Sequence, residues 1–129
     1  MLQGSARRSD TLACMALTVE LDRPNDVTAI LTLSGPLNLG TDLKIFDTQV
    51  QLLIEEGVRR LVLDLTACPY TDSSGLGVMV HAYGLIDKKG GAIRLCGVSE
   101  RIASMLKMTH TDPLLPCDED LAASLAALA

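Results

Sequence analysis

The sequence predicts a single α/β domain with a mostly parallel central sheet, an N-terminal antiparallel hairpin, and helices after the second strand. Apolar and polar residues alternate twice between residues 14 and 33, which is the period of strands with one buried face. The short apolar run Leu61–Leu65 is typical of a central strand covered on both faces. Strand-like and helix-like segments then alternate to the C-terminus, as they do in parallel sheets.

Length and composition fit one such domain. The chain has 129 residues, 48% of them hydrophobic, which is a common size and composition for a single domain. The first residues lack the long apolar centre of a secretory signal, so we expect a flexible N-terminal arm over residues 1–12 and a domain over residues 13–129. No stretch approaches the ~20 apolar residues of a membrane span, so we expect no membrane contact.

The net charge and the cysteine spacing indicate which partners and cofactors to expect. The net charge is −5, and basic residues form isolated pairs rather than a stripe, so we expect no nucleic-acid partner. The cysteines form no C-x-x-C motif, so we expect reduced core cysteines of a cytoplasmic protein, with no metal and no cofactor. These cysteines are Cys14, Cys68, Cys96 and Cys117.

The hairpin comes first along the chain. Its strands are expected over residues 14–22 and 27–33, with Arg23-Pro24-Asn25-Asp26 as the turn between them. Ser34-Gly35-Pro36 ends the second strand. A helix follows, capped by Thr41 or Asp42 and closed before Gly57. Its apolar residues fall on one helical stripe: Leu43, Phe46, Val50, Leu53 and Ile54.

A second helix follows the central strand. It starts near Asp72 or Ser73 and ends with Lys88-Lys89, cations that favour the negative end of the helix dipole, before Gly90-Gly91. Its stripe consists of Leu76, Met79, Val80, Tyr83 and Ile86. The two glycines at the start of this helix are expected to let it pack closely on the sheet; they are Gly75 and Gly77.

The C-terminal third continues the alternation. A strand is expected over residues 92–98, and Ser99 caps a third helix that carries Ile102, Met105 and Leu106. Leu114-Leu115, between two prolines, is expected to form a short edge strand. The acidic residues 118–120 then favour the start of a last helix with Leu121, Leu125 and Leu128 inside.

Two adjacent hydroxyls, Ser73 and Ser74, lie where the second helix begins. A nucleophilic serine needs a base within hydrogen-bond reach. His81 lies roughly 10 Å further along the same helix, and only His110, in a later loop, could approach. The G-x-S-x-G elbow and the phosphate-loop pattern are both absent. These observations disfavour a hydrolase.

Capping and phosphorylation are the remaining interpretations. Asp72, Ser73 and Ser74 are all residue types that cap helices, and capping alone explains them. However, the preceding loop lies at the carboxyl end of a central strand, a usual functional edge, and the Ser73 hydroxyl is expected at the surface. A phosphoserine adds about −1.5 to −2 charge, which a helix N-terminus accepts without melting. Ser73 is therefore a candidate switch of binding rather than of folding.

The sequence resembles the STAS domains, most closely the bacterial anti-sigma factor antagonists. The motif is D-S-S-G-L-G at residues 72–77, followed by an amphipathic helix, a glycine turn and a strand that carries L-C-G-V at residues 95–98. The opening segment LTLSGPLNLGT, residues 31–41, also resembles the family, and the likeness covers about residues 13–128.

The resemblance implies a non-enzymatic regulator. In such antagonists the first serine of the motif, here Ser73, is phosphorylated by an anti-sigma factor that is also a serine kinase. The unphosphorylated antagonist binds that kinase, the phosphorylated one is released, and a serine phosphatase resets it. The alternative is a STAS module that acts as a constitutive scaffold, with Ser73 only a cap. Either protein is expected to be a monomer or a weak dimer.

One partner-binding patch is expected at the edge of the sheet. The family often carries Asp where this chain has Asn38, which keeps hydrogen bonding but loses the charge; a turn residue after Pro36 explains it equally. Met79 is either exposed in the patch or part of the core. The expected patch residues are Asn38, Leu39, Thr41, Tyr70, Thr71, Asp72, Ser73, Ser74, Gly75 and Met79.

Overall fold

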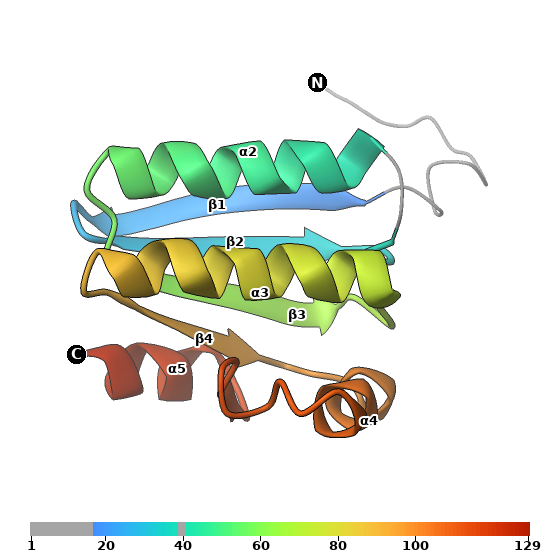
Figure 1. Cartoon of the computed structure of the whole chain (residues 1–129). Coiled ribbons are helices and arrows are strands. Elements are labelled where there is room, and N and C mark those ends of the chain that lie inside the picture. The colour runs from blue at the N-terminus through green and yellow to red at the C-terminus, as the bar shows by residue number, and fades with distance from the viewer. Residues whose placement is uncertain (1–16, 39–40) are drawn as a thin grey trace.

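The computed structural model describes residues 17–38 and 41–129, and these residues form a five-stranded sheet in the order β1-β2-β3-β4-β5 (Figure 1). β1 pairs antiparallel with β2, and the other neighbours are parallel. This arrangement confirms the predicted α/β fold. The proposed arm, residues 1–12, and the proposed domain start lie outside the described residues. The strands are β1 (Thr18–Asn25), β2 (Thr28–Ser34), β3 (Arg60–Ala67), β4 (Ala92–Cys96) and β5 (Cys117–Asp118).

Helices cover both faces of the sheet. α2 and α3 lie side by side on one face, and α5 packs its leucines against Ile30, Val62 and Cys96 on the opposite face. Within the described ranges, no helix is long and apolar enough to span a membrane. The helices are α2 (Thr41–Glu55), α3 (Ser73–Lys88), α4 (Glu100–Met108) and α5 (Leu121–Leu128).

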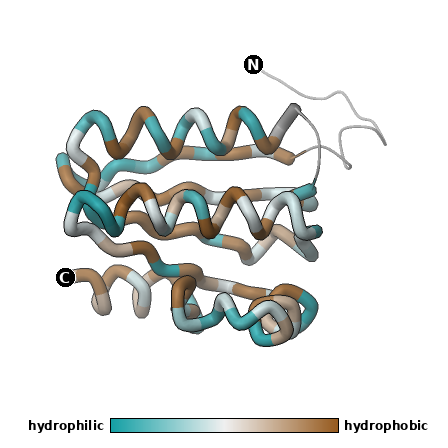
Figure 2. The backbone as a smooth tube through the Cα atoms, in the orientation of Figure 1, coloured by the Kyte–Doolittle hydropathy of each residue, from teal (hydrophilic) through white to brown (hydrophobic). Residues whose placement is uncertain are grey.

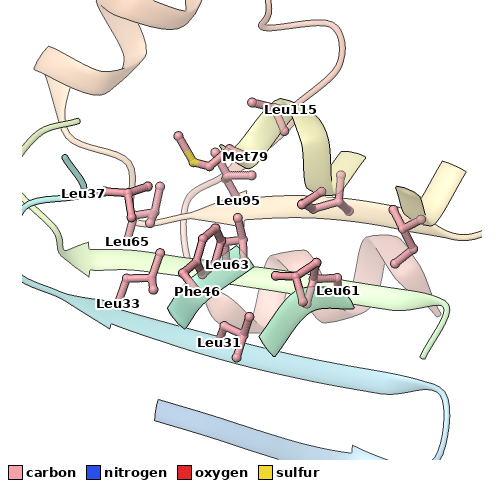
Figure 3. Packing of buried hydrophobic residues seen from close by; sticks show 14 of the residues in the cluster. Leu31, Leu33, Leu37, Phe46, Leu61, Leu63, Leu65, Met79, Leu95 and Leu115 are labelled. Atoms are coloured by element: carbon pink, nitrogen blue, oxygen red, sulfur yellow. The ribbon is translucent and has the colours of Figure 1, made fainter. Parts of the chain in front are cut away.

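The main core lies between the sheet and the α2/α3 layer. Hydrophobic and hydrophilic residues alternate along both helices about once per turn (Figure 2). Phe46 of α2 and Met79 of α3 reach over Leu63 and Leu95 of the central strands, and all four side chains are fully buried (Figure 3). The central strand β3 is therefore covered on both faces, as its apolar run predicts.

The hairpin turn lies further along the chain than predicted. β1 continues to Asn25, which pairs with Thr28, so the turn residues are Asp26 and Val27. The pairing is irregular between Asp22 and Asn25, which accommodates Pro24 in the strand. β1 is an edge strand, where the missing N–H of proline removes no ladder hydrogen bond.

The last strand also differs from the prediction. It was expected at Leu114-Leu115, but β5 comes after the second proline, at Cys117–Asp118. Leu115 is instead fully buried in the core. Because of this shift Cys117 is exposed, so the expectation of a core cysteine is wrong there, whereas Cys68 and Cys96 are buried as expected. Cys14 lies outside the described residues.

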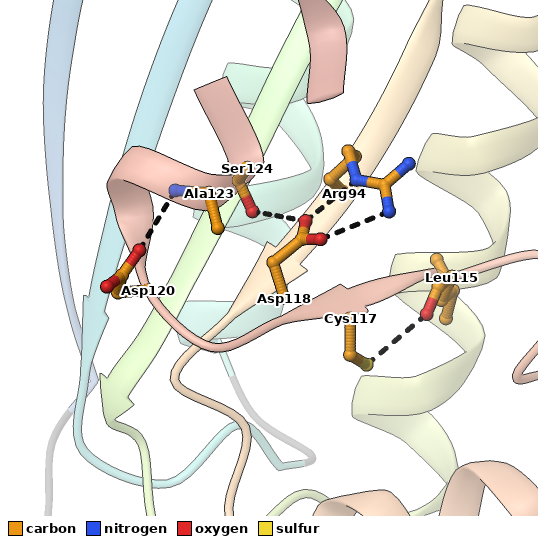
Figure 4. Close-up of polar contacts among 7 residues, drawn as sticks. All are labelled: Arg94, Leu115, Cys117, Asp118, Asp120, Ala123 and Ser124. Carbon is orange, nitrogen blue, oxygen red and sulfur yellow. Dashed lines mark hydrogen bonds and ion pairs between the residues drawn. The ribbon is translucent and has the colours of Figure 1, made fainter. Parts of the chain in front are cut away.

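An ion pair joins β5 to the rest of the sheet (Figure 4). The Asp118 carboxylate accepts hydrogen bonds from Arg94 Nε at 2.7 Å and Arg94 Nη2 at 3.1 Å. It also accepts one at 2.7 Å from the hydroxyl of Ser124, a fully buried residue of α5. Hydrogen bonding from Arg94 holds the pKa of Asp118 below its usual value. This cluster connects β4, the two-residue strand β5 and α5.

Replacing Asp118 by alanine should lower the free energy of unfolding by about 1–3 kcal/mol at pH 7, because three hydrogen bonds to a carboxylate are lost. Since the folded-state pKa of Asp118 is lowered, this stabilisation is present above its ordinary pKa and is lost as the pH falls through the lowered value. Urea unfolding at pH 7 and at about pH 2.5 measures the difference. A difference between parent and variant that does not shrink in acid contradicts the assignment.

Candidate functional site

The candidate site lies where the loops after β2 and β3 meet. Hydrogen bonds of Leu37 join the two loops. The Leu37 N–H donates to the Tyr70 carbonyl oxygen at 3.1 Å. The Leu37 carbonyl oxygen accepts hydrogen bonds from Thr71 Oγ1 at 2.7 Å and from the Asp72 N–H at 3.3 Å. Asn38 Nδ2 donates to the Tyr70 hydroxyl at 3.2 Å. Neighbouring parallel strands bring both loops to one sheet edge, and these bonds hold them together.

The N-terminus of α3 begins directly after this junction. Asp72 is the N-cap, because its side chain accepts a hydrogen bond from Gly75 N–H at 2.9 Å. Ser73 is therefore the first helical residue and not the cap, which removes capping as the explanation of its hydroxyl. Ser73 is exposed, and Ser74 is partly exposed. The candidate switch residue thus lies at the surface, as predicted.

Electrostatics at this position favour an added negative charge. The first N–H groups of an α-helix have no partner within the helix, and the helix dipole is positive at this end. Asp72 takes up one of these groups, the N–H of Gly75. A phosphoryl group on Ser73 would therefore stand beside a helix end that stabilises anions, and also beside the Asp72 carboxylate on the outer surface.

Gly75 allows α3 to approach the junction closely. A Cβ atom at this position would lie 2.1 Å from Thr71 Oγ1 and 2.3 Å from the Leu37 carbonyl oxygen, so no side chain fits. Gly77 is different, since a Cβ there would meet no atom within 4 Å. The predicted close packing of glycines is therefore confirmed for Gly75 and wrong for Gly77.

The structure places the ten expected patch residues at different depths. Met79 of α3 is fully buried, so of its two expected places the core is confirmed and the exposed patch is wrong; the apolar stripe of the helix determines its direction. Leu39 lies outside the described residues, as does the Thr41 side chain. Thr71 and Gly75 are buried and shape the site from beneath. The residues that reach the surface are Asn38, Tyr70, Asp72, Ser73 and Ser74.

Arg101 belongs to this edge and was not predicted from the sequence. Its guanidinium carbon lies 4.8 Å from the centroid of the Tyr70 ring, a cation–π distance. Ser99, the cap of α4, donates a hydrogen bond to the Pro69 carbonyl oxygen at 2.9 Å, which fixes α4 beside the same loop. Figure 1 shows α4 and the first turn of α3 at the same end of the sheet. Arg101 therefore adds a cation beside Tyr70 at this edge of the sheet.

The two histidines belong to different elements of the fold. His81 Nδ1 is 3.0 Å from Asp47 Oδ1, so His81 connects α3 to α2 rather than reaching back to Ser73. His110 follows α4 with a φ of 60°, at the end of that helix. Among the described residues, no three His, Cys, Asp or Glu side chains converge as a metal-binding group.

Comparison with known proteins points to one family. A model of the STAS domain matches residues 18–124. A protein of Paenibacillus polymyxa named anti-sigma F factor antagonist is 32% identical over 107 residues, which cover 79% of this chain and 86% of that protein. Among solved structures, the anti-sigma factor antagonist SpoIIAA in its unphosphorylated form superposes with a TM-score of 0.75 at 16% identity, covering 85% of this chain and 96% of that one.

The phosphorylated form of the Bacillus protein SpoIIAA also matches. It superposes with a TM-score of 0.70 at 14% identity and covers 85% of this chain and 99% of that chain. At such identities the likeness concerns the fold alone. For SpoIIAA itself, the two forms share a fold that this chain shares as well.

The close contact at Gly75 predicts opposite effects on stability for alanine at position 75 and alanine at position 77. Gly75→Ala should lower the free energy of unfolding by about 2 kcal/mol or more, since the added methyl group meets Thr71 and the Leu37 carbonyl. Gly77→Ala, two residues along, should raise it by up to about 1 kcal/mol through helix propensity. Thermal and urea unfolding measure both. Equal effects of the two substitutions contradict the proposed close approach.

Proposed function

This chain belongs to the STAS domain family, and we propose that it is a non-enzymatic switch that acts as an anti-sigma factor antagonist. In this proposal, the unphosphorylated protein binds an anti-sigma factor that is also a serine kinase. Phosphorylation of Ser73 releases it, and a serine phosphatase restores the binding form. The kinase supplies ATP and Mg²⁺, so this chain needs no cofactor of its own. Binding and release take place in the cytoplasm.

One observation carries the proposal. Ser73 is exposed at the first position of α3, while Asp72 performs the capping that would otherwise account for a serine there. A kinase needs a hydroxyl that its active site can reach without unfolding the substrate. The name of the 32% identical relative supports the same role.

A comparison of free energies explains why this modification would switch binding rather than folding. A charge beside a helix N-terminus typically changes stability by about 0.3–1 kcal/mol, against about 5–15 kcal/mol for a whole domain. At a contact surface, the same charge must be desolvated or repelled, and an unpaired charge in an interface costs about 2–5 kcal/mol. The fold therefore tolerates phosphorylation while a complex that covers Ser73 does not.

The contact surface follows from the exposed residues around Ser73. Asn38, Tyr70, Asp72 and Ser74 surround it at one edge of the sheet, and Thr71 and Gly75 support them from below. We include Leu39 and Thr41 in the proposed surface because they follow Asn38 in the chain. Asn38 uses its amide to hold Tyr70, so this position contributes a hydrogen bond without the negative charge that the family often has there.

Phosphorylation in an extract of the cells that produce this protein tests the proposal before the kinase has been identified. With labelled ATP, the parent protein and Ser74→Ala should both be phosphorylated, while Ser73→Ala should lose more than about 90% of the label. Ser74 is the matched control because it is the adjacent hydroxyl in the same helical turn. Purified protein with ATP and Mg²⁺ alone should stay unmodified.

The constitutive scaffold is the alternative function, and binding separates it from the switch. Once the kinase from that extract is purified, Ser73→Asp should bind it at least about 30-fold more weakly than Ser73→Ala does, which corresponds to about 2 kcal/mol. Equal affinity of the two variants supports the scaffold and contradicts the switch. Label that remains on Ser73→Ala places the phosphorylation elsewhere.

A further inference from the structure

The outward face of α2 carries two large apolar side chains. Ile45 is 58% exposed and Leu52 is 52% exposed. They lie seven residues apart and therefore on the same side of the helix, two turns from each other. With Lys44, Thr48 and Gln49 they line a shallow hollow of about 470 Å³ on the surface.

The other sides of α2 already have contacts. Its apolar stripe, which includes Phe46 and Val50, is buried in the core. On one flank, Asp47 accepts a hydrogen bond from Gln51 and contacts His81 of α3. The face with Ile45 and Leu52 is the one side of α2 without such contacts, and none of the described residues covers it.

Charges at the two ends of this face have opposite signs. Lys44 lies at its N-terminal end and Glu55 at its C-terminal end, 11 positions or about three turns apart and on the same flank of the helix. Both residues are exposed. A surface with an apolar centre, a cation at one end and an anion at the other end is complementary to itself when one copy is reversed.

We propose that this face of α2 is a self-association surface that binds a second copy of the chain in an antiparallel, two-fold symmetric dimer. With the symmetry axis between Thr48 and Gln49, Ile45 of each copy packs on Leu52 of the other copy. Lys44 of each copy then lies within about one helical turn of Glu55 of the other, so the ion pair forms twice. The inference stands on these residues and not on the proposed switch.

The second copy is the occupant that this arrangement favours. In a two-fold interface each residue contacts its complement reciprocally, and both the apolar pair and the charged pair of α2 meet this condition. One stripe of a 15-residue helix provides an area at the small end of specific interfaces, so the dimer should be weak.

Sedimentation equilibrium of the purified full chain tests the proposal, over loading concentrations from about 10 µM to about 1 mM. The parent protein should show a monomer–dimer equilibrium in this range. The double variant Ile45→Gln/Leu52→Gln, which keeps helix propensity, should weaken the dimer at least tenfold. Met108→Gln is the matched control, because Met108 is an apolar residue 80% exposed on α4, and it should leave the equilibrium unchanged.

A charge exchange tests the antiparallel pairing itself. Lys44→Glu and Glu55→Lys should each weaken the dimer about three- to tenfold, and the double exchange should restore it to within about threefold of the parent. A parent protein that is monomeric at about 1 mM overturns the proposal. So does a dimer that neither the apolar variant nor the charge variants weaken, even if that face then proves to bind another protein.

Discussion

The Leu37 carbonyl group is the contact on which the candidate site depends. It accepts hydrogen bonds from Thr71 Oγ1 and Asp72 N–H, and it lies so close to α3 that only glycine fits at position 75. These contacts lock the loop after β2 to the loop after β3. As a result α3 begins at Ser73, with the half-buried Asp72 as its cap and Ser73 exposed.

The exposed Ser73 side chain takes no part in the packing that stabilises the fold. The core lies between the sheet and the α2/α3 layer, and the Arg94–Asp118–Ser124 cluster lies on the opposite face. Neither needs the exposed hydroxyl. A change of charge at Ser73 would therefore change the free energy of folding little, as the proposed switch requires. This separation is what a binding switch requires of its scaffold.

Local patterns predicted the elements, and tertiary contacts decided the details. The apolar stripe and Asp72 were enough to predict α3, because helix period and N-caps are local signals. The hairpin turn lies further along the chain than predicted because Pro24 is tolerated in an edge strand. β5 follows the predicted position because Leu115 is buried in the core. Met79 belongs to the apolar stripe of α3, and this stripe is the sequence signal that favours its place in the core. Arg101 carried no sequence signal, because its contact with Tyr70 depends on where α4 packs.

The central claim is that a phosphoryl group on Ser73 changes the surface and leaves the architecture intact. The most direct measurement is a pair of ¹H–¹⁵N correlation spectra, one of the protein and one of the same protein with phosphoserine installed at position 73. We expect shifted signals in residues 37–38, 70–76 and near Arg101, with the core signals unchanged and a melting temperature within a few degrees. Loss of dispersion throughout the spectrum, or shifts spread over β4 and α5, would contradict the account.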